Sequence, residues 1–329
     1  MWRAGRVIAT AGCREPGPPR FARAAQQLRP CNVLHRDRAA RGGGVAAAGG
    51  RVFVTTGFGF MVALDSASGA EAWRAEGGAP FQSAPTVSGT RVYATTNDSE
   101  LMAVDAGTGE VLWTHQAIAE PARILSASSV AIDGETVVAP FASGEVTALL
   151  AANGRRLWTD SLSRSGRLTS LSAINDIAGR PAIDGGIAYA ASHSGVIAAI
   201  DVRSGQRVWA RGFASTQTPF VSGDVLYAVS IDGALAAFSC ATGGVHWMTQ
   251  LRRFENESER KGRVAWVGPI MMGGRLVLAN SVGDVVAVTA ETGQIVAQTE
   301  IGQPVFIPPI VANEQIYLVT DDARLVVLR

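Results

Sequence analysis

The chain has 329 residues with nearly balanced charge, 29 Lys plus Arg against 28 Asp plus Glu, and 47% of its residues are hydrophobic. This composition is typical of a globular protein and excludes disordered and fibrous chains. No apolar run approaches the roughly 18 residues of a transmembrane helix, so the sequence predicts no membrane span. The length allows two ordinary domains or one large repeat domain.

The first part of the chain differs in composition from the rest. Residues 1–42 contain nine arginines against Glu15 and Asp37, and they show neither helical nor strand periodicity. We therefore predict an irregular Arg- and Pro-rich segment at 1–42, outside the fold, and a folded domain at 43–329. The folded part is net acidic, which argues against nucleic-acid binding because such binding requires a clustered basic face.

The cysteines indicate no structural chemistry. Cys13, Cys31 and Cys240 form no C-x-x-C pair, so neither a zinc site nor a disulfide framework is predicted. Residues 7–13 end in a cysteine as a lipobox does, but their apolar core is shorter than the roughly seven residues that a signal peptide requires. The sequence therefore contains no convincing signal peptide.

An eleven-residue pattern, A-x-D-x-x-(S/T)-G-x-x-x-W, returns along the chain after residue 42. Complete copies occupy 63–73, 103–113 and 199–209, altered copies occupy 148–158, 237–247 and 287–297, and a partial copy lies at 325–329. Six steps lead from Asp65 to Arg329, so the mean spacing is 44 residues.

The sequence between the copies alternates apolar and polar residues in short runs bounded by Gly, Asp and Asn, which is typical of strands and hairpins. About 44 residues with four short strands is the size of one propeller blade. We therefore predict an all-β fold: a β-propeller of four-stranded blades, with about six to seven blades present and the ring not necessarily closed.

The repeated residues have a structural interpretation. Glycine at the turn supplies the positive φ that a tight reversal needs, and the tryptophan four residues later lies on the next strand. We predict that each indole ring packs between adjacent blades, where its burial contributes about 2–3 kcal/mol. The repeat glycines are Gly69, Gly109, Gly154, Gly205, Gly243 and Gly293, and the tryptophans are Trp73, Trp113, Trp158, Trp209 and Trp247.

The pattern is similar to the tryptophan-docking repeat of quinoprotein (PQQ-type) propellers, over about 63–329. Two families share that repeat: the pyrroloquinoline-quinone dehydrogenases, and the non-enzymatic BamB-type lipoproteins of the outer-membrane β-barrel assembly machinery. Further segments resemble the second family. They are 83–87, 114–116, 120–123, 171–181, 260–262, Trp266 and 268–269.

The resemblance implies a scaffold subunit that assists folding and insertion of outer-membrane proteins. It implies a position at the periplasmic face of the outer membrane, as a monomer within a complex, with a barrel-forming (BamA-type) assembly protein and nascent outer-membrane proteins as partners. Family members resemble eight-bladed propellers carried on a lipid-anchored cysteine. We therefore interpret 1–42 as replaced sequence and expect about one and a half blades to be missing.

By the same resemblance, the partner contact uses loops of the third-to-fifth-blade region. Those positions correspond to Arg123, Ile124 and Leu125, with Asp176 and Arg180 as neighbours. The Leu-x-Leu-Arg pattern of the family is not kept, because Ser126 follows Leu125.

No catalytic, cofactor-binding or metal-binding residue is predicted. The four histidines have no metal-ligand spacing, and Asp176, Asp232 and Asp284 are interpreted as turn aspartates rather than cation ligands. Two alternatives to the scaffold remain: a fragment of a PQQ-dependent dehydrogenase, and an orphan periplasmic propeller that binds peptide or polysaccharide.

Two connections are longer than the blade period requires. The first, 160–181, carries Leu168, Leu171, Ile174 and Ile177, which a purely solvated loop would not need, so it is a candidate docking element. The second, 251–267, mixes charges of both signs and is predicted to be a solvated hairpin tip.

Overall fold

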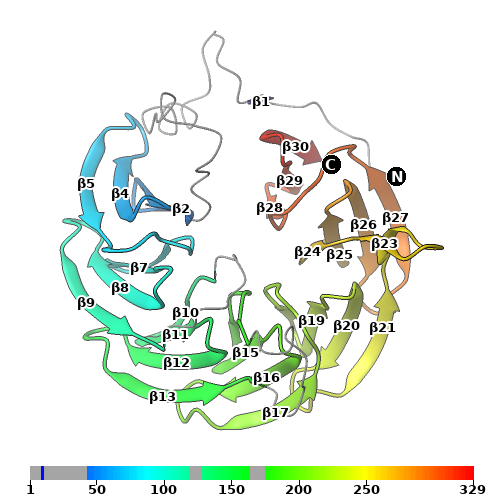
Figure 1. Cartoon of the computed structure of the whole chain (residues 1–329), viewed down its shortest axis with the longest axis horizontal. Helices are drawn as coiled ribbons and strands as arrows, with labels where there is room; N and C mark the ends of the chain where they lie inside the picture. Colours follow the sequence, from blue (N-terminus) through cyan, green and yellow to red (C-terminus); the bar gives the residue numbers. More distant parts are fainter. Residues whose placement is uncertain (1–8, 11–42, 119–127, 164–174) are drawn as a thin grey trace. The chain divides into compact units, whose positions relative to one another are not determined.

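The computed structural model describes residues 9–10, 43–118, 128–163 and 175–329 (Figure 1). Regular structure in these residues is all β, and none of them forms a helix long and apolar enough to cross a membrane. The fold is a seven-bladed β-propeller of four-stranded antiparallel blades. The predicted fold class and blade count are therefore confirmed.

The first four blades follow one another in chain order, and each uses four consecutive strands. Blade 1 contains β2 (Gly43–Ala48), β3 (Arg51–Thr56), β4 (Phe60–Asp65) and β5 (Glu71–Glu76). Blade 2 contains β6 (Thr86–Ser88), β7 (Arg91–Thr95), β8 (Glu100–Asp105) and β9 (Val111–Gln116). Blade 3 contains β10 (Ala131–Asp133), β11 (Thr136–Pro140), β12 (Glu145–Leu150) and β13 (Arg156–Ser161). Blade 4 contains β14 (Ala182–Asp184), β15 (Ile187–Ala191), β16 (Val196–Asp201) and β17 (Arg207–Gly212).

The remaining blades include one inserted hairpin and one strand from the start of the chain. Blade 5 contains β18 (Phe220–Ser222), β19 (Val225–Val229), β20 (Ala234–Ser239) and β21 (Val245–Gln250). A separate two-stranded sheet follows, made of β22 (Phe254–Asn256) and β23 (Lys261–Arg263). Blade 6 contains β24 (Trp266–Met272), β25 (Arg275–Asn280), β26 (Asp284–Thr289) and β27 (Ile295–Glu300). Blade 7 contains β28 (Ile310–Ala312), β29 (Gln315–Val319), β30 (Arg324–Leu328) and β1 (Ala9–Thr10).

The short strand β1 completes blade 7 by pairing antiparallel with β30, with Ala9 opposite Leu325 and Thr10 opposite Arg324. Two residues of the N-terminal segment thus lie in a blade sheet. The rest of residues 1–42 lie outside the described part of the chain, so the predicted domain boundary at residue 43 stays a prediction.

The chain divides into two compact units, and the division runs through blade 4. One unit consists of Glu15–Ala188, which includes blades 1–3, and of Asp201–Gln206. The other holds β1, Tyr189–Ile200 and everything from Arg207 to Arg329, including blades 5–7.

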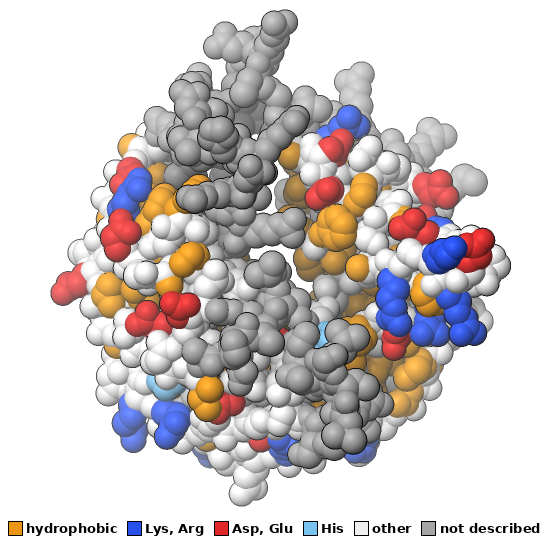
Figure 2. Space-filling model, in the orientation of Figure 1, with side chains coloured by type: hydrophobic (Ala, Val, Ile, Leu, Met, Phe, Trp, Pro, Cys, Tyr) orange, Lys and Arg blue, Asp and Glu red, His pale blue; other side chains and the backbone are white. Residues whose placement is uncertain are grey.

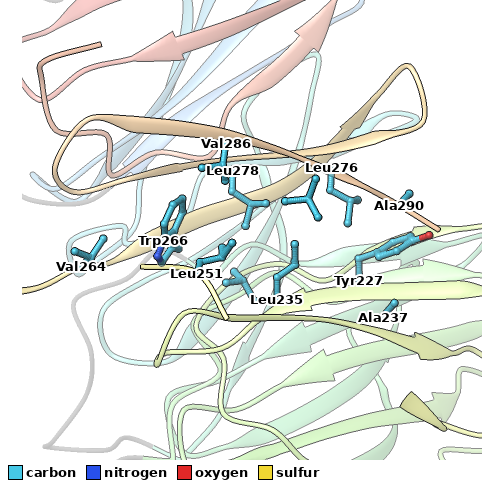
Figure 3. Packing of buried hydrophobic residues seen from close by; sticks show 12 residues of the cluster. Tyr227, Leu235, Ala237, Leu251, Val264, Trp266, Leu276, Leu278, Val286 and Ala290 are labelled. Atoms are coloured by element: carbon cyan, nitrogen blue, oxygen red, sulfur yellow. The ribbon is translucent and has the colours of Figure 1, made fainter. Parts of the chain in front are cut away.

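The middle strands of blade 2 are buried on both faces because this blade packs between blades 1 and 3. In β8, Met102 and Val104 join the core that contains Trp73 of blade 1. Leu101 and Ala103, one position away, join the core shared with blade 3. Alternation with a period of two therefore divides each strand between two cores. The core between blades 5 and 6 has the same form: Leu235 and Ala237 face Leu276 and Leu278 (Figure 3).

Each repeat tryptophan docks on the repeat glycine of the next blade. Trp113 Nε1 donates to the carbonyl of Ala151 at 2.9 Å, and its ring lies so close to Gly154 that an added Cβ would be 2.6 Å from a ring carbon. The other four pairs repeat this arrangement: Trp73 with Gly109, Trp158 with Gly205, Trp209 with Gly243, and Trp247 with Gly293. The glycine is needed for its positive φ and also because a side chain would displace the ring.

The repeat aspartates stabilise the same turns from within. The Asp105 carboxylate accepts hydrogen bonds from the backbone N–H groups of Gly107 and Thr108, at 2.8 and 2.9 Å, and from the Thr108 hydroxyl at 3.2 Å. The backbone hydrogen bond from Thr108 is the main cause that lowers the pKa of Asp105 below its ordinary 3.8. Hydrogen bonds from Ser68 and Ser204 likewise lower the pKa values of Asp65 and Asp201.

The tryptophan–glycine contact can be tested against a glycine with the same backbone geometry and no ring nearby. Gly154 and Gly89 both have positive φ, 71° and 56°, but an added Cβ at Gly89 would meet nothing within 4 Å. We expect Gly154→Ala to lower the free energy of unfolding by about 1–3 kcal/mol more than Gly89→Ala, because only the first displaces an indole. Trp113→Ala should cost about 3–5 kcal/mol. Urea unfolding followed by circular dichroism measures all three, and equal losses for the two glycine variants would contradict the ring contact.

The hydrogen-bonded aspartates of the repeat turns should make part of the folding stability sensitive to acid. Their folded-state pKa values lie below the ordinary 3.8, so they stabilise the fold above that pH and the stabilisation is lost as pH falls through the folded-state values. A triple variant, Asp65→Asn with Asp105→Asn and Asp201→Asn, should therefore lose less stability than the wild type between about pH 6 and pH 3. Melting temperatures of the wild type and the triple variant are measured across that range. If both fall in parallel with pH, the aspartate hydrogen bonds contribute nothing to the pH dependence of stability.

Candidate protein-docking site

The predicted partner-binding residues fall into two groups. Arg123, Ile124 and Leu125 lie outside the described residues, so their role stays a prediction. Asp176 and Arg180 lie in the segment 175–181, which leads from blade 3 into β14. The geometry of the site is therefore built from this segment.

The segment 175–181 is held against the turn between β11 and β12 of blade 3. Ile177 N donates to the carbonyl of Phe141 at 3.5 Å, and the Ser128 hydroxyl donates to the carbonyl of Gly179 at 3.2 Å. Gly144, with φ of 83°, allows the close approach, because an added Cβ would be 2.9 Å from the carbonyl oxygen of Asn175. A glycine in the turn thus makes room for the backbone of the connection.

Burial separates the side chains of this segment into an anchor and an exposed group. Ile177 is fully buried and Ala178 nearly so, which accounts for one of the four apolar residues in the long connection. Leu168, Leu171 and Ile174 lie outside the described residues. Asp176 is only 5% exposed, whereas Arg180 is exposed to solvent. A partner approaching this segment would therefore meet Arg180 before Asp176.

Arg180 keeps its positive charge although neighbouring protein atoms exclude part of the water around its guanidinium. This desolvation lowers the pKa of the guanidinium. Arginine stays protonated at neutral pH even after such a shift. Arg180 thus presents a positive charge suited to pairing with a carboxylate.

Two apolar side chains at the same end of the blades were not predicted from the sequence. Phe58 lies at the tip of the β3–β4 turn with 62% of its surface exposed, and Ile118 follows β9 with 60% exposed. Antiparallel strands place the β3–β4 turn at the same end of the blades as the connections that leave β9 and β13. The sequence could have indicated Phe58, because the residue lies between Gly57 and Gly59. Two glycines favour a turn, and a turn residue has no strand neighbours to bury its ring.

The other aspartates considered as cation ligands have arginine partners. Asp232 accepts from Arg263 at 2.7 Å, and Asp284 lies 3.3 Å from Arg252. Within the described ranges, no group of three or more His, Cys, Asp or Glu residues is placed to hold a metal ion.

Comparison with known proteins identifies the family. A family model described as outer membrane protein assembly factor BamB matches residues 3–249 and 249–329. The chain belongs to the BamB family. BamB of Escherichia coli (strain K12) is 31% identical over 281 residues, which cover 85% of this chain and 69% of the relative. BamB of Salmonella typhimurium (strain LT2) is 31% identical over 288 residues, 87% of this chain and 71% of the relative.

Solved structures agree on the fold. The crystal structure of BamB from Moraxella catarrhalis superposes with a TM-score of 0.78 at 23% identity, covering 88% of this chain and 85% of that one. A europium-containing methanol dehydrogenase superposes with a TM-score of 0.66 at 14% identity, covering 84% and 72%. At these identities the structures show a shared propeller, and the BamB membership rests on the sequence matches.

Because Ile177 is buried and Arg180 is exposed, truncating the two side chains should change the free energy of unfolding by very different amounts. Ile177→Ala should lower the free energy of unfolding by about 2–5 kcal/mol, because it leaves a cavity beside the blade 3 turn. Arg180→Ala should change it by no more than about 0.5 kcal/mol, as is usual for exposed positions. Chemical denaturation of both variants measures the difference, and a large loss at Arg180 would show that this side chain belongs to the core.

Proposed function

We propose that this protein is a non-enzymatic assembly factor for outer-membrane proteins. It acts at the periplasmic face of the outer membrane through contacts with the barrel-forming component of the assembly machinery. The observation that carries the proposal is the match of the BamB family model to nearly the whole chain, in both of its compact units. Relatives from Escherichia coli and Salmonella typhimurium bear the same name, outer membrane protein assembly factor.

The structure supports a role in which a rigid scaffold presents connections to a partner. Blades fix the ends of each connection, so side chains on the connections are placed without the entropic cost of ordering a free loop. In the blade 1–3 unit, the buried Ile177 anchors the segment that carries Arg180. In the proposal, Arg180 supplies a charge that orients a partner carboxylate, and Ile124 and Leu125, which lie outside the described residues, would supply apolar contacts.

The enzymatic alternative has less support. It rests on the likeness to methanol dehydrogenase, which at 14% identity reaches no further than the fold. The relatives that share 31% of their sequence are named as assembly factors. No finding favours an orphan propeller that binds peptide or polysaccharide. Nascent outer-membrane proteins remain a second class of partner within the assembly role.

Binding to the barrel-forming assembly protein of the same organism tests the proposal. The purified chain should bind the purified periplasmic part of that protein, and Arg180→Glu should weaken the dissociation constant by at least about tenfold, or 1.4 kcal/mol. The pair Arg123→Glu with Ile124→Asp should have at least as large an effect. Arg155→Glu, an exposed charge reversal on the β12–β13 turn, is the matched control and should bind normally.

Two further readings complete the test. Melting temperatures of the variants should stay within a few degrees of the wild type, so that lost binding is not lost folding. Adding pyrroloquinoline quinone, Ca²⁺ and an alcohol should produce no dye reduction. Turnover in that assay, or no binding by the wild-type chain, would overturn the proposed function.

A further inference from the structure

The hairpin of β22 and β23 is an addition that the blades do not require. Phe254 pairs with Arg263 and Asn256 with Lys261, in a two-stranded sheet of its own. The connection that contains it takes fifteen residues, 251–265, whereas seven residues, 213–219, join blade 4 to blade 5. The extra residues form a hairpin that projects from the blades, and they are not needed to connect blade 5 to blade 6.

The base of the hairpin is fixed to blade 6 by Arg252. Its guanidinium lies 3.3 Å from the carboxylate of Asp284, which is 2% exposed and also accepts from Asn280 at 3.0 Å. The same guanidinium donates to the carbonyls of Phe254 and Glu255 at 3.0 and 2.9 Å. One side chain therefore joins a buried anion of the blade to the first strand of the hairpin.

The tip of the hairpin is ordered by its own side chains. The Glu257 carboxylate accepts from the backbone N–H groups of Arg253 and Phe254, at 2.8 and 3.2 Å. Asn256 Oδ1 accepts from the Ser258 hydroxyl at 2.7 Å and from Glu259 N at 3.1 Å. An isolated two-stranded hairpin is only marginally stable in water. The sequence predicted a solvated hairpin tip here, and the structure shows a hairpin whose residues 255–263 are exposed. These bonds and the Arg252 anchor stabilise its conformation.

The exposed side of the hairpin gathers two arginines around one aromatic ring. The guanidinium carbons of Arg253 and Arg263 lie 5.6 and 5.9 Å from the centre of the Phe254 ring. Both arginines also reach Asp232 of the β19–β20 turn, at 3.6 and 2.7 Å. Their side chains are 43% and 63% exposed. The two arginines share the Asp232 carboxylate, and the Glu257 carboxylate also lies near Arg253, so the charges of the cluster are balanced while both guanidinium groups stay partly exposed.

The surrounding charges distinguish between two kinds of anionic partner. Basic and acidic side chains lie together on this part of the surface (Figure 2). In the sequence, basic residues flank the run that contains Glu255, Glu257 and Glu259. A sheet of anionic lipid headgroups would be repelled by these glutamates. A protein surface can place its own charges opposite both signs, and arginine beside an aromatic ring is the composition of protein interfaces.

We propose that the β22–β23 hairpin is a second protein-docking element, in which Arg253 and Arg263 receive a carboxylate of the barrel-forming assembly protein over the Phe254 ring. The inference rests on the proposed function for the identity of the partner. It adds a contact in the blade 5–7 unit, distinct from the segment 175–181. The hairpin is formed before binding, and Asp232 and the Phe254 ring already hold both arginines in place, so binding has little to order.

Affinity measurements with a paired control test the hairpin. The wild-type chain and the double variant Arg253→Glu with Arg263→Glu are titrated with the purified periplasmic part of the barrel-forming protein. The double variant should bind at least about tenfold more weakly, and its affinity should depend less on salt. The control Arg155→Glu with Arg156→Glu makes the same charge change on exposed residues of blade 3 and should keep wild-type affinity.

A neutral variant guards against loss of folding. Arg253→Gln with Arg263→Gln adds no charge beside Asp232, so it should melt like the wild type and still bind several-fold more weakly. Normal affinity of both hairpin variants, with a wild-type chain that binds, overturns the docking element and leaves the proposed function intact. A wild-type chain that does not bind overturns both.

The competing partner is tested with vesicles of phosphatidylglycerol and phosphatidylethanolamine. The wild-type chain should sediment with them no more than the double variant does. Sedimentation of the wild type that the double variant abolishes would assign the arginines to a lipid surface and overturn the protein contact.

Discussion

The contact of an indole ring with a glycine of the next blade is the constraint on which the rest of the structure depends. A blade is a small sheet with two apolar faces and cannot bury both by itself, so its stability comes from its neighbours. Five tryptophans each donate a hydrogen bond to a carbonyl in the turn they cover, which sets the height and the angle of one blade against the next. In blade 6, Ala297 stands at the position of the repeat tryptophan. The core between blades 6 and 7 is built from aliphatic side chains such as Val277, Val285 and Ile316.

Arginine adds a second kind of link between blades. The Arg51 guanidinium donates to the carbonyls of Ala106 and Gly107 in the next blade, and Arg211 donates to those of Thr242 and Gly243. A planar guanidinium with five N–H groups can satisfy several carbonyls of one turn at once, which an ammonium does less well. At these two positions the geometry gives a physical reason for arginine rather than lysine.

Two connections exceed what the blades need, and each is secured in its own way. An apolar anchor, Ile177, holds the segment that carries Arg180, while an ion pair between Arg252 and the buried Asp284 holds the β22–β23 hairpin. The buried carboxylate would be unfavourable without its partners, so the anchor also specifies one position for the hairpin. In both cases a fixed base presents arginine to solvent, which suits partners that carry carboxylates.

The repeat predicts the fold class, the blade size and the turn glycines, because period-two alternation and turn chemistry are local properties of the chain. The local sequence could not show that Gly154 must also leave space for the ring of Trp113, since the two residues lie in different blades. Nor could it show that Asp176 is buried, or that Arg252 reaches Asp284 across 32 positions. The strand β1 carries no periodic signal in its two residues, and its pairing with β30 is visible only in the folded chain. Contacts of this kind depend on how blades pack and on which side chains the packing brings together, so the tertiary structure alone decides them.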